Sequence, residues 1–296
     1  MKIVTTGGTG VVGTALRTAL AMRGDVAVNI SRSGPGPTWD VEKGRLDPAV
    51  LAGADALVNL AGEPLFGRWT PERRRRILRS RVDGTALLVS ALGTLPAGAR
   101  PAVFVSGSAT GYYGDRGEEE LDEDSPPGVG FLAEVAAAWE TEALRATELG
   151  VRVTVVRTGT VCSTRGGALA ATLPFFRLGL GGRAGSGEQW VPWIHVDDMA
   201  RILIHRIDRA SSGPILASAP HPERQRRVAE TVGRILSRPT LAAAPRAALR
   251  LALGRGVADE LVLPSQKTKP KKAIEEGFEF RFPRLDEALR DLLEKR

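Results

Sequence analysis

The sequence has very few of the residues that build metal centres or disulfides. It contains one cysteine, Cys162, and three histidines among 296 residues. No intramolecular disulfide can form, and no metal-ligand spacing is present, so we predict no metal. A single cysteine fits a reducing compartment, and we expect a cytoplasmic protein. No apolar run reaches the roughly 20 residues that span a bilayer, and the start lacks the flanks of a signal peptide, so no membrane partner is expected.

Acidic residues are outnumbered by basic ones, which raises the question of a nucleic-acid partner. The formal net charge is +7, and the densest basic run is Arg73-Arg74-Arg75-Arg76. Thr70, Pro71 and Glu72 directly before it are typical of a helix start. No aromatic residues interleave with the arginines as a stacking platform would require. We therefore expect a solvated helix face and no nucleic-acid partner.

Strand and helix patterns alternate along most of the chain. Strands are predicted at residues 2–6, 25–30, 57–60, 102–106, 151–156 and 215–218, and helices at 11–22, 71–92, 129–149, 196–207 and 285–293. Apolar strands that alternate with helices predict an α/β fold, a Rossmann-like, doubly wound parallel sheet. Residues 1–235 are the predicted nucleotide-binding domain, with a glycine-rich loop at 179–187 facing the substrate side. Residues 236–296 are predicted to form a small C-terminal α+β lobe on the ligand edge.

A glycine-rich turn lies between the first predicted strand and the first predicted helix. It consists of Gly7, Gly8, Thr9, Gly10, Val11, Val12 and Gly13. The glycines allow a tight turn and a close approach of the backbone to a pyrophosphate, and Gly13 lets the helix pack on the strand. The helix start adds unpaired N–H groups and positive partial charge. The strand–turn–helix context therefore predicts a dinucleotide site.

The end of the second predicted strand lacks the acid that an NAD site usually offers to the ribose 2′-hydroxyl. It reads Asn29-Ile30-Ser31-Arg32-Ser33 instead. Arg32 can pair with a 2′-phosphate through charge-assisted hydrogen bonds, and Ser31 can add a donor. We therefore predict NADP(H) as the cofactor, although Arg32 could also be an ordinary exposed loop residue.

Further residues are predicted to line the same cofactor. Asp47 could accept a hydrogen bond from the adenine amine, or it could cap a helix that begins at Pro48. Arg81 could bind a cofactor phosphate or ribose or a substrate anion, or it could lie on a helix surface. The predicted contacts are completed by residues that end or follow later strands: Leu60, Ala61, Gly62, Ser106, Arg157, Gly159 and Val161.

With these residues in place, the chain resembles the extended short-chain dehydrogenase/reductase superfamily, in its NAD-dependent epimerase/dehydratase branch. More narrowly, it resembles the divergent subgroup called epimerase family proteins, which carry an uncharacterised C-terminal domain. The resemblance covers nearly the whole chain. Beyond the turn and Ser31-Arg32, it rests on residues 59–64, Trp69, 80–82, 106–114, 131–135, 139–140, 185–187, 193–198 and 277–278. It implies an oxidoreductase-like, NADP-binding protein, and it suggests a homodimer formed through long helices.

The catalytic residues that the resemblance implies are incomplete. Superfamily enzymes use a serine, a tyrosine as acid/base and a lysine four residues after that tyrosine. Ser108 stands at the serine position, but Phe131 and Val135 stand where the tyrosine and lysine are expected. A register shift by one residue gives Leu132 and Ala136, which restores neither group. Neither a phenyl ring nor a valine can take part in proton transfer.

Two tyrosines remain in the sequence, Tyr112 and Tyr113. Either could act as the acid, or both could pack the loop that closes the nucleotide pocket. His195 is another titratable candidate, but its position before Asp197 is more typical of a helix start, and Glu63 is a candidate of similar standing.

Two functions remain open at this point. The first is an NADP(H)-dependent oxidoreductase or epimerase with altered proton-transfer groups, acting on an unidentified small polar substrate. The second is a non-catalytic NADP(H)-binding sensor or scaffold, in which the nucleotide stabilises a surface for a partner. The missing tyrosine and lysine motivate the second function.

Overall fold

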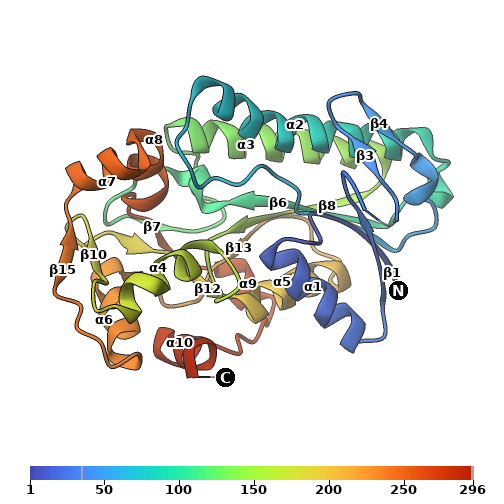
Figure 1. The fold of residues 1–296 in the computed structure, drawn as a ribbon. Coiled ribbons are helices and arrows are strands. Elements are labelled where there is room, and N and C mark those ends of the chain that lie inside the picture. Colours follow the sequence, from blue (N-terminus) through green and yellow to red (C-terminus); the bar gives the residue numbers. More distant parts are fainter. Residues whose placement is uncertain (35, 295–296) are drawn as a thin grey trace.

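The centre of the fold is a six-stranded parallel sheet in a computed structural model that describes residues 1–34 and 36–294 (Figure 1). Its strand order is β13-β8-β6-β5-β1-β2, and neighbouring strands run parallel throughout. The strands are β1 (Lys2–Thr6), β2 (Val26–Ile30), β5 (Ala56–Asn59), β6 (Val103–Ala109), β8 (Arg152–Thr158) and β13 (Gly213–Ala217). The Rossmann-like parallel sheet predicted from the sequence is confirmed.

Helices cover both faces of this sheet, as Figure 1 shows. On one face lie α1 (Val11–Met22) and α5 (Val196–Asp208), and on the other lie α2 (Pro71–Thr94) and α3 (Phe131–Leu144). Successive strand side chains point to opposite faces. Thus Ile3 packs with Leu16 and Leu203 on the first face, while Val4 packs with Leu88 and Leu92 on the second. Two separate apolar cores hold the layers together.

The helix expected at residues 129–149 is shorter than predicted. Gly130 has a φ of 115°, which is outside the helical region, so α3 begins only at Phe131. It continues after Leu144 as a 3₁₀ helix, η4 (Arg145–Leu149), and Gly150 ends it in the left-handed conformation at φ 76°. The other helices predicted from the sequence begin and end within two residues of the observed ones.

A smaller lobe lies on the edge of the sheet where the strands end. Its helices are α4 (Gly167–Arg177), α6 (Gln225–Ile235), α7 (Arg246–Leu253), α8 (Arg255–Val257), the π-helical turn η5 (Ala258–Val262), α9 (Lys271–Glu275) and α10 (Leu285–Glu294). Its core combines Phe176 of α4, Val232 of α6 and Leu289 of α10. Helices from before residue 236 therefore share one core with the C-terminal helix.

Short elements lie outside the central sheet, most of them as two-stranded pairs. The pairs are β3 (Trp39–Asp40) with β4 (Arg45–Leu46), β7 (Glu120–Leu121) with β16 (Lys267–Thr268), β9 (Thr160–Cys162) with β12 (Trp193–His195), β10 (Gly182–Ala184) with β15 (Ala242–Ala244), and β11 (Trp190–Val191) with β14 (Glu223–Arg224). The 3₁₀ helices are η1 (Pro48–Val50), η2 (Ala97–Ala99) and η3 (Thr110–Tyr113). The glycine-rich stretch 179–187 thus contains a strand, β10, as well as loop.

Buried carboxylates attach the C-terminal segment to the sheet. Asp198 is fully buried at the start of α5 and accepts the backbone N–H groups of Arg281 and Phe282 at 2.9 and 2.8 Å. Glu123 accepts the backbone N–H groups of Leu216 and Lys272 at 3.0 and 3.2 Å. These bonds fix the lobe against the strand ends. In the described part of the chain, no helix is long and apolar enough to cross a membrane.

Candidate functional site

The strand order reverses next to β1, and this reversal positions the site. The chain passes from β1 to β2 on one side and then returns to β5 on the other side of β1. In open parallel sheets, ligands bind beyond the carboxyl ends of the strands at such a switch point. The glycine-rich turn follows β1, and Leu60-Ala61-Gly62 follows β5. The two predicted backbone segments therefore lie beside each other at the switch point.

The glycine-rich turn leaves no room for side chains. A Cβ atom on Gly7, whose φ is 69°, would lie 2.6 Å from the carbonyl carbon of Leu60. A Cβ atom on Gly13 would lie 2.6 Å from the Cα of Gly8. Gly10 caps α1 without any side-chain hydrogen bond, so the first N–H groups of the helix face outward with Thr9, Val11 and Val12 around them. This is a cradle for an anionic group.

A buried network holds the ends of β1 and β5 in this arrangement. Thr6 donates to the Oδ1 atom of Asn59 at 2.6 Å, and Asn59 donates to Thr85 at 2.9 Å. Thr85 in turn donates to the carbonyl of Arg81 on α2 at 2.6 Å. Asn29 at the end of β2 accepts the N–H of Gly8 at 2.9 Å. Sequence reasoning missed the roles of Asn59 and Asn29, because they depend on partners more than twenty residues away.

The two residues after β2 differ in how they are held. Ser31 donates through its hydroxyl to the carbonyl of Ser33 at 2.8 Å. The Arg32 side chain is exposed, and among the described residues no carboxylate pairs with it. The guanidinium is thus free to meet an anion. Asp47 caps η1 and accepts the N–H of Ala49 at 3.0 Å, which is the second of its two predicted roles.

Arg81 is largely buried on α2 beside the end of β5. It donates to the carbonyls of Glu63 and Ile77, both at 3.1 Å, and its guanidinium lies 5.4 Å from the ring of Trp139. A Cβ atom on Gly62 would lie 2.8 Å from the guanidinium carbon. Burial lowers the pKa of Arg81 to about 10, so it stays charged at neutral pH. A cation therefore faces the strand end that was predicted to line the cofactor.

The remaining predicted cofactor positions lie along the carboxyl edge of the sheet. Ser106 is fully buried in β6. The N–H of Gly159 donates to the carbonyl of Ala217 at 3.0 Å, and Val161 packs against the core under α1. A Cβ atom on Gly166, at the start of α4, would lie 2.6 Å from Val11. The start of α4 thus meets the glycine-rich turn, a contact that sequence reasoning missed.

Ser108 belongs to a buried polar cluster with Glu140, Arg157 and Tyr113. Its hydroxyl donates to Glu140 at 2.6 Å, and the Arg157 guanidinium binds both carboxylate oxygens of Glu140 at 2.9 Å. Arg157 also donates to the Tyr113 hydroxyl and to the carbonyl of Glu123, both at 3.0 Å. Burial disfavours the charge on Arg157, but the bonds to Glu140 outweigh it and raise the pKa of Arg157 above its usual value. Every polar atom of Ser108, Glu140 and Arg157 is directed into this cluster.

The two tyrosines occupy different environments. Tyr113 is fully buried, its hydroxyl donates to the carbonyl of Asp122 at 2.9 Å, and burial raises its pKa above the usual value. Tyr112 is only half-buried, and the Arg157 guanidinium lies 3.6 Å from the centre of its ring. No hydrogen bond holds its hydroxyl among the described residues. Tyr112 is therefore the tyrosine whose hydroxyl remains available.

Phe131 and Val135 stand where the usual tyrosine and lysine are expected, and both lie among packed side chains. The ring of Phe131 meets Trp69 edge to face, with centroids 5.3 Å apart, and the guanidinium of Arg74 lies 4.9 Å from it. Val135 is buried one turn further along α3. Arg73 donates to the carbonyls of Pro64 and Phe66. Arg73 and Arg74 are thus partly covered by the loop at 63–70, while Arg75 and Arg76 are exposed, in keeping with the solvated face predicted for most of these arginines.

His195 caps the start of α5, as its position suggested. Its Nδ1 atom accepts the N–H of Asp197 at 3.0 Å, and burial lowers its pKa below the usual value. The fold also brings Asp291 of α10 within 3.4 Å of Nε2, so His195, Asp197 and Asp291 form a group that could hold a metal ion. The sequence could not indicate this group, because Asp291 lies on a distant helix. The capping role already explains the orientation of the ring.

The switch point, the glycine cradle and the arginines around it define a dinucleotide-binding α/β protein. The profile of the NAD dependent epimerase/dehydratase family matches residues 3–216, and a domain of unknown function, DUF1731, matches residues 244–292. The chain belongs to the NAD-dependent epimerase/dehydratase family. The family resemblance inferred from the sequence is confirmed.

Several proteins are similar to this chain over nearly its whole length. Human epimerase family protein SDR39U1 is 36% identical over 99% of this chain and 100% of its own length. Its crystal structure with NADPH superimposes with a TM-score of 0.91 at 34% identity, over 100% of both chains. An epimerase family protein of Mycobacterium tuberculosis is 35% identical over 96% of this chain and 94% of its own. A UDP-glucose 4-epimerase of Thermotoga maritima, 17% identical with a TM-score of 0.80 over 99% of this chain and 98% of its own, shares the fold.

The buried pair of Glu140 and Arg157 generates a stability prediction. Glu140→Ala leaves the Arg157 charge buried without a partner, so we expect the free energy of unfolding to fall by about 4 kcal/mol. The combined variant Glu140→Leu, Arg157→Met removes both charges, and we expect it to regain most of this loss. Urea unfolding of the three proteins measures both differences. Glu140→Gln, which keeps the shape and loses the charge, is the milder variant should the alanine form fail to fold. Equal losses in the alanine and combined variants would contradict the assignment.

Proposed function

We propose that this protein binds NADP(H) and acts as an atypical oxidoreductase or epimerase on a small polar substrate. The observation that supports NADP(H) binding is the cradle formed by Gly7, Gly13 and the open start of α1, because backbone atoms line it. The NADPH in the structure of human SDR39U1 supports the same cofactor here. Bound NADP(H) would supply or accept a hydride.

The residues around the cradle have distinct roles in this proposal. The N–H groups at the start of α1 bind the pyrophosphate. Arg32 and Ser31 bind the 2′-phosphate, which explains why no acid follows β2. Arg81 places a positive charge beside Gly62, where the cofactor passes the end of β5. Gly159 and Val161 close the cofactor's reactive end from the side of β8.

Ser108 and Tyr112 are the catalytic candidates. Because Ser108 donates its proton to Glu140, its oxygen can only accept a hydrogen bond from a substrate hydroxyl. Tyr112 has a hydroxyl that no hydrogen bond holds among the described residues, so it is the better candidate to contact a substrate. Tyr113, by contrast, is held by two hydrogen bonds and acts as a positioning residue for Arg157.

Arg32 provides a test of cofactor choice. We expect Arg32→Ala to weaken NADPH binding by about thirtyfold, since a hydrogen bond to a charged group contributes roughly 2 kcal/mol. NADH binding should not change, because NADH lacks the 2′-phosphate. Fluorescence titration of both cofactors measures the two affinities, with Arg209→Ala, on an exposed arginine at the end of α5, as the matched control. Equal weakening for NADPH and NADH would count against a 2′-phosphate role.

A second test concerns turnover. NADPH oxidation is followed spectrophotometrically across a library of carbonyl compounds and nucleotide sugars. We expect activity with at least one of them, a loss of about a hundredfold or more in Tyr112→Phe, and a similar loss in Ser108→Ala. Tyr113→Phe should lower stability more than it lowers the rate. Failure across a broad library, with NADPH binding intact, would refute the catalytic proposal.

That failure would favour the second candidate, a non-catalytic NADP(H)-binding sensor or scaffold. The specific observation in its favour is the apolar packing of Phe131 and Val135 where proton-transfer groups usually stand. Such a protein would show a thermal shift with NADPH and no turnover with any substrate. Detection of hydride transfer would exclude it.

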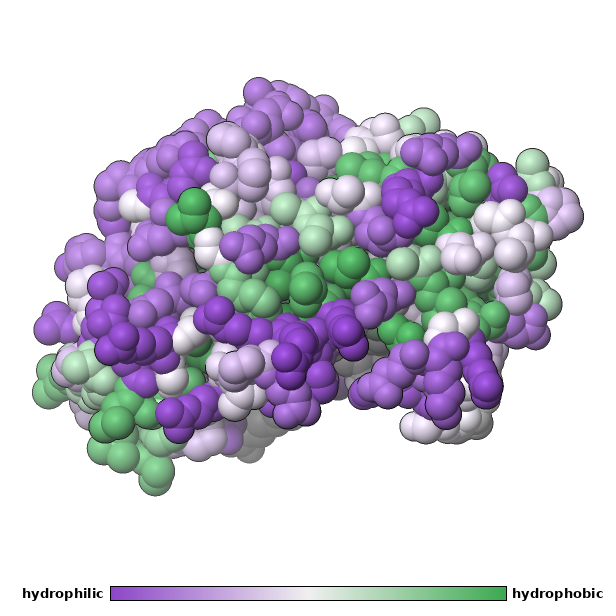
Figure 2. Space-filling view, turned by 90° about the horizontal axis from the view of Figure 1, so that it is seen from above, coloured by the Kyte–Doolittle hydropathy of each residue, from purple (hydrophilic) through white to green (hydrophobic). Residues whose placement is uncertain are grey.

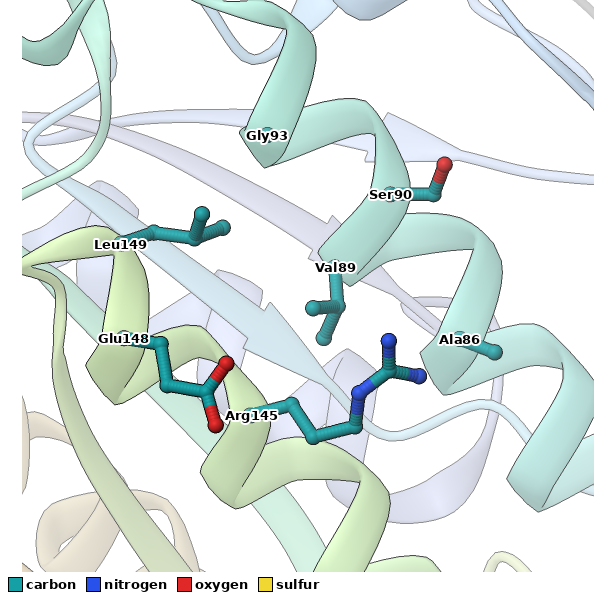
Figure 3. A pocket seen from close by; sticks show the side chains of 7 residues that line it. All are labelled: Ala86, Val89, Ser90, Gly93, Arg145, Glu148 and Leu149. Atoms are coloured by element: carbon teal, nitrogen blue, oxygen red, sulfur yellow. The ribbon is translucent and has the colours of Figure 1, made fainter.

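We also propose a homodimer formed through the outer face of α2 and α3. A groove lies between α2 and η4, the 3₁₀ continuation of α3, and it is lined by Ala86, Val89, Ser90, Gly93, Arg145, Glu148 and Leu149 (Figure 3). Figure 2 views the molecule from above and shows hydrophobic residues interspersed on this face. Leu78 and Leu144 are exposed there at 36% and 40%. Small side chains on α2 would let a second helix pair approach closely.

A bulky charge in the groove tests this dimer. We expect Ala86→Arg to yield a monomer in sedimentation velocity experiments, because the new guanidinium would be buried without a partner. Ala97→Arg, on the exposed turn after α2, is the control that should leave the association unchanged. A wild-type protein that sediments as a monomer at all concentrations would exclude the proposal.

The remaining parts of the proposal concern the cellular compartment and the partners of the protein. Cys162 is buried, and burial raises its pKa to about 12, so it is an inert thiol that fits a reducing cytoplasm. Nucleic acid is not a proposed partner. Arg73 and Arg74, the first residues of the basic run, are engaged by the loop at 63–70 and by aromatic rings.

A further inference from the structure

Two segments that are far apart in the sequence form one end of the lobe. Residues 175–184 comprise the end of α4 and β10, and residues 237–253 comprise β15 and α7; together we call them the arginine–leucine tip. Parallel pairing of Gly182 with Ala242 joins the segments. Figure 1 shows α7, β15 and β10 at the opposite end of the molecule from the N-terminus. The tip is therefore a single surface remote from the groove between α2 and η4.

Large apolar side chains of the tip face solvent. Phe175, Leu178, Leu180, Leu241 and Leu251 are exposed by between 58% and 94%. Helix α7 contributes no buried residue at all. Figure 2 shows hydrophobic residues gathered at this end of the molecule, beside hydrophilic ones. Exposed apolar side chains gathered in this way mark an interaction surface more often than an ordinary one.

The tip carries positive charge only. Its two segments contain five arginines and no aspartate, glutamate or lysine. Arg250 is paired with Asp259 at 2.9 Å. In the described part of the chain, Arg177, Arg183, Arg238 and Arg246 have no carboxylate partner. Two of the acids outside the two segments are already paired, since Glu188 pairs with Arg226 and Asp286 pairs with Arg234.

The charge and the side-chain types of the tip together indicate which kind of partner binds it. A second copy of the same surface would bring like charges together, which costs free energy. A protein partner usually centres on tryptophan, tyrosine or arginine anchors, and leucine is under-represented among them. Arginines beside protruding leucine and phenylalanine side chains are the pattern of surfaces that lie on anionic lipid. We propose that the arginine–leucine tip binds the surface of an anionic bilayer.

This surface association does not require a membrane-spanning helix. The sequence argument against a membrane partner rested on the length of apolar runs, and a surface that inserts single side chains has no long run. The tip places Leu178 and Leu241 where they could enter the interface between headgroups and acyl chains, with Arg238 and Arg246 at the phosphates. The proposal stands independently of cofactor binding and catalysis.

Co-sedimentation of the full-length protein with vesicles tests the proposal. We expect binding to phosphatidylcholine vesicles that contain phosphatidylglycerol, weak binding to phosphatidylcholine alone, and release by added salt. Arg238→Gln with Arg246→Gln should weaken binding by about tenfold or more, because each basic residue near an anionic surface contributes substantially. Leu178→Ser with Leu241→Ser should weaken vesicle binding by a similar factor. The size of this loss should depend less on the salt concentration than the loss in the arginine variant.

The matched control combines Met22→Ser with Arg209→Gln, which change one exposed apolar residue and one exposed arginine away from the tip. NADPH titration of every variant reports that the fold is intact. Three results would overturn the proposal: no binding to anionic vesicles, an equal loss in the control, or unchanged binding in the leucine variant. If the leucine substitutions change the sedimentation coefficient of the protein and leave vesicle binding unchanged, the tip is instead a contact between copies of the chain.

Discussion

The ion pair between Glu140 and Arg157 is the interaction on which the polar cluster around Ser108 depends. It joins α3 to β8 in a region that water does not reach. Two buried charges are costly unless each finds its partner and its hydrogen bonds. Ser108 and Tyr113 supply those bonds, and a backbone carbonyl of Glu123 supplies another. The ion pair therefore decides where Ser108 and the tyrosine loop can lie.

The same ion pair connects the site to the C-terminal lobe. Glu123 accepts N–H groups from β13 and from α9, so the loop that carries the two tyrosines is held between the sheet and the lobe. Asp198 fixes the following segment in the same way. Because these acceptors are carboxylates with no exposed surface to spare, a shift of the lobe would leave buried N–H groups unpaired. The lobe and the catalytic candidates are consequently positioned as one unit.

The nucleotide half could be predicted from the sequence because its determinants are local. The turn from Gly7 to Gly13 lies between adjacent elements, and strands such as 2–6 are short runs rich in β-branched residues. The polar cluster around Ser108 and the C-terminal lobe could not be predicted in this way. They depend on long-range pairs such as Arg157 with Glu140 and Asp291 with His195. Helix α4, which contains Pro174, and the lobe core it shares with α10 were missed for the same reason. The length of α3 was overestimated because the conformation of Gly130 is not encoded by hydrophobic periodicity.

The loss of the usual tyrosine and lysine has a structural counterpart on the neighbouring helix. Phe131 and Val135 form an apolar stripe on α3, and α2 covers it with arginines: Arg74 lies over Phe131 and Arg81 over Trp139. A lysine added on this side of α3 would face a helix that already carries positive charge, and like charges repel. The aromatic residues on α3 and the arginines on α2 thus suit each other. Restoring Tyr and Lys at positions 131 and 135 alone would therefore not rebuild the usual catalytic set, since in the proposed function Arg81 of α2 brings positive charge to the cofactor.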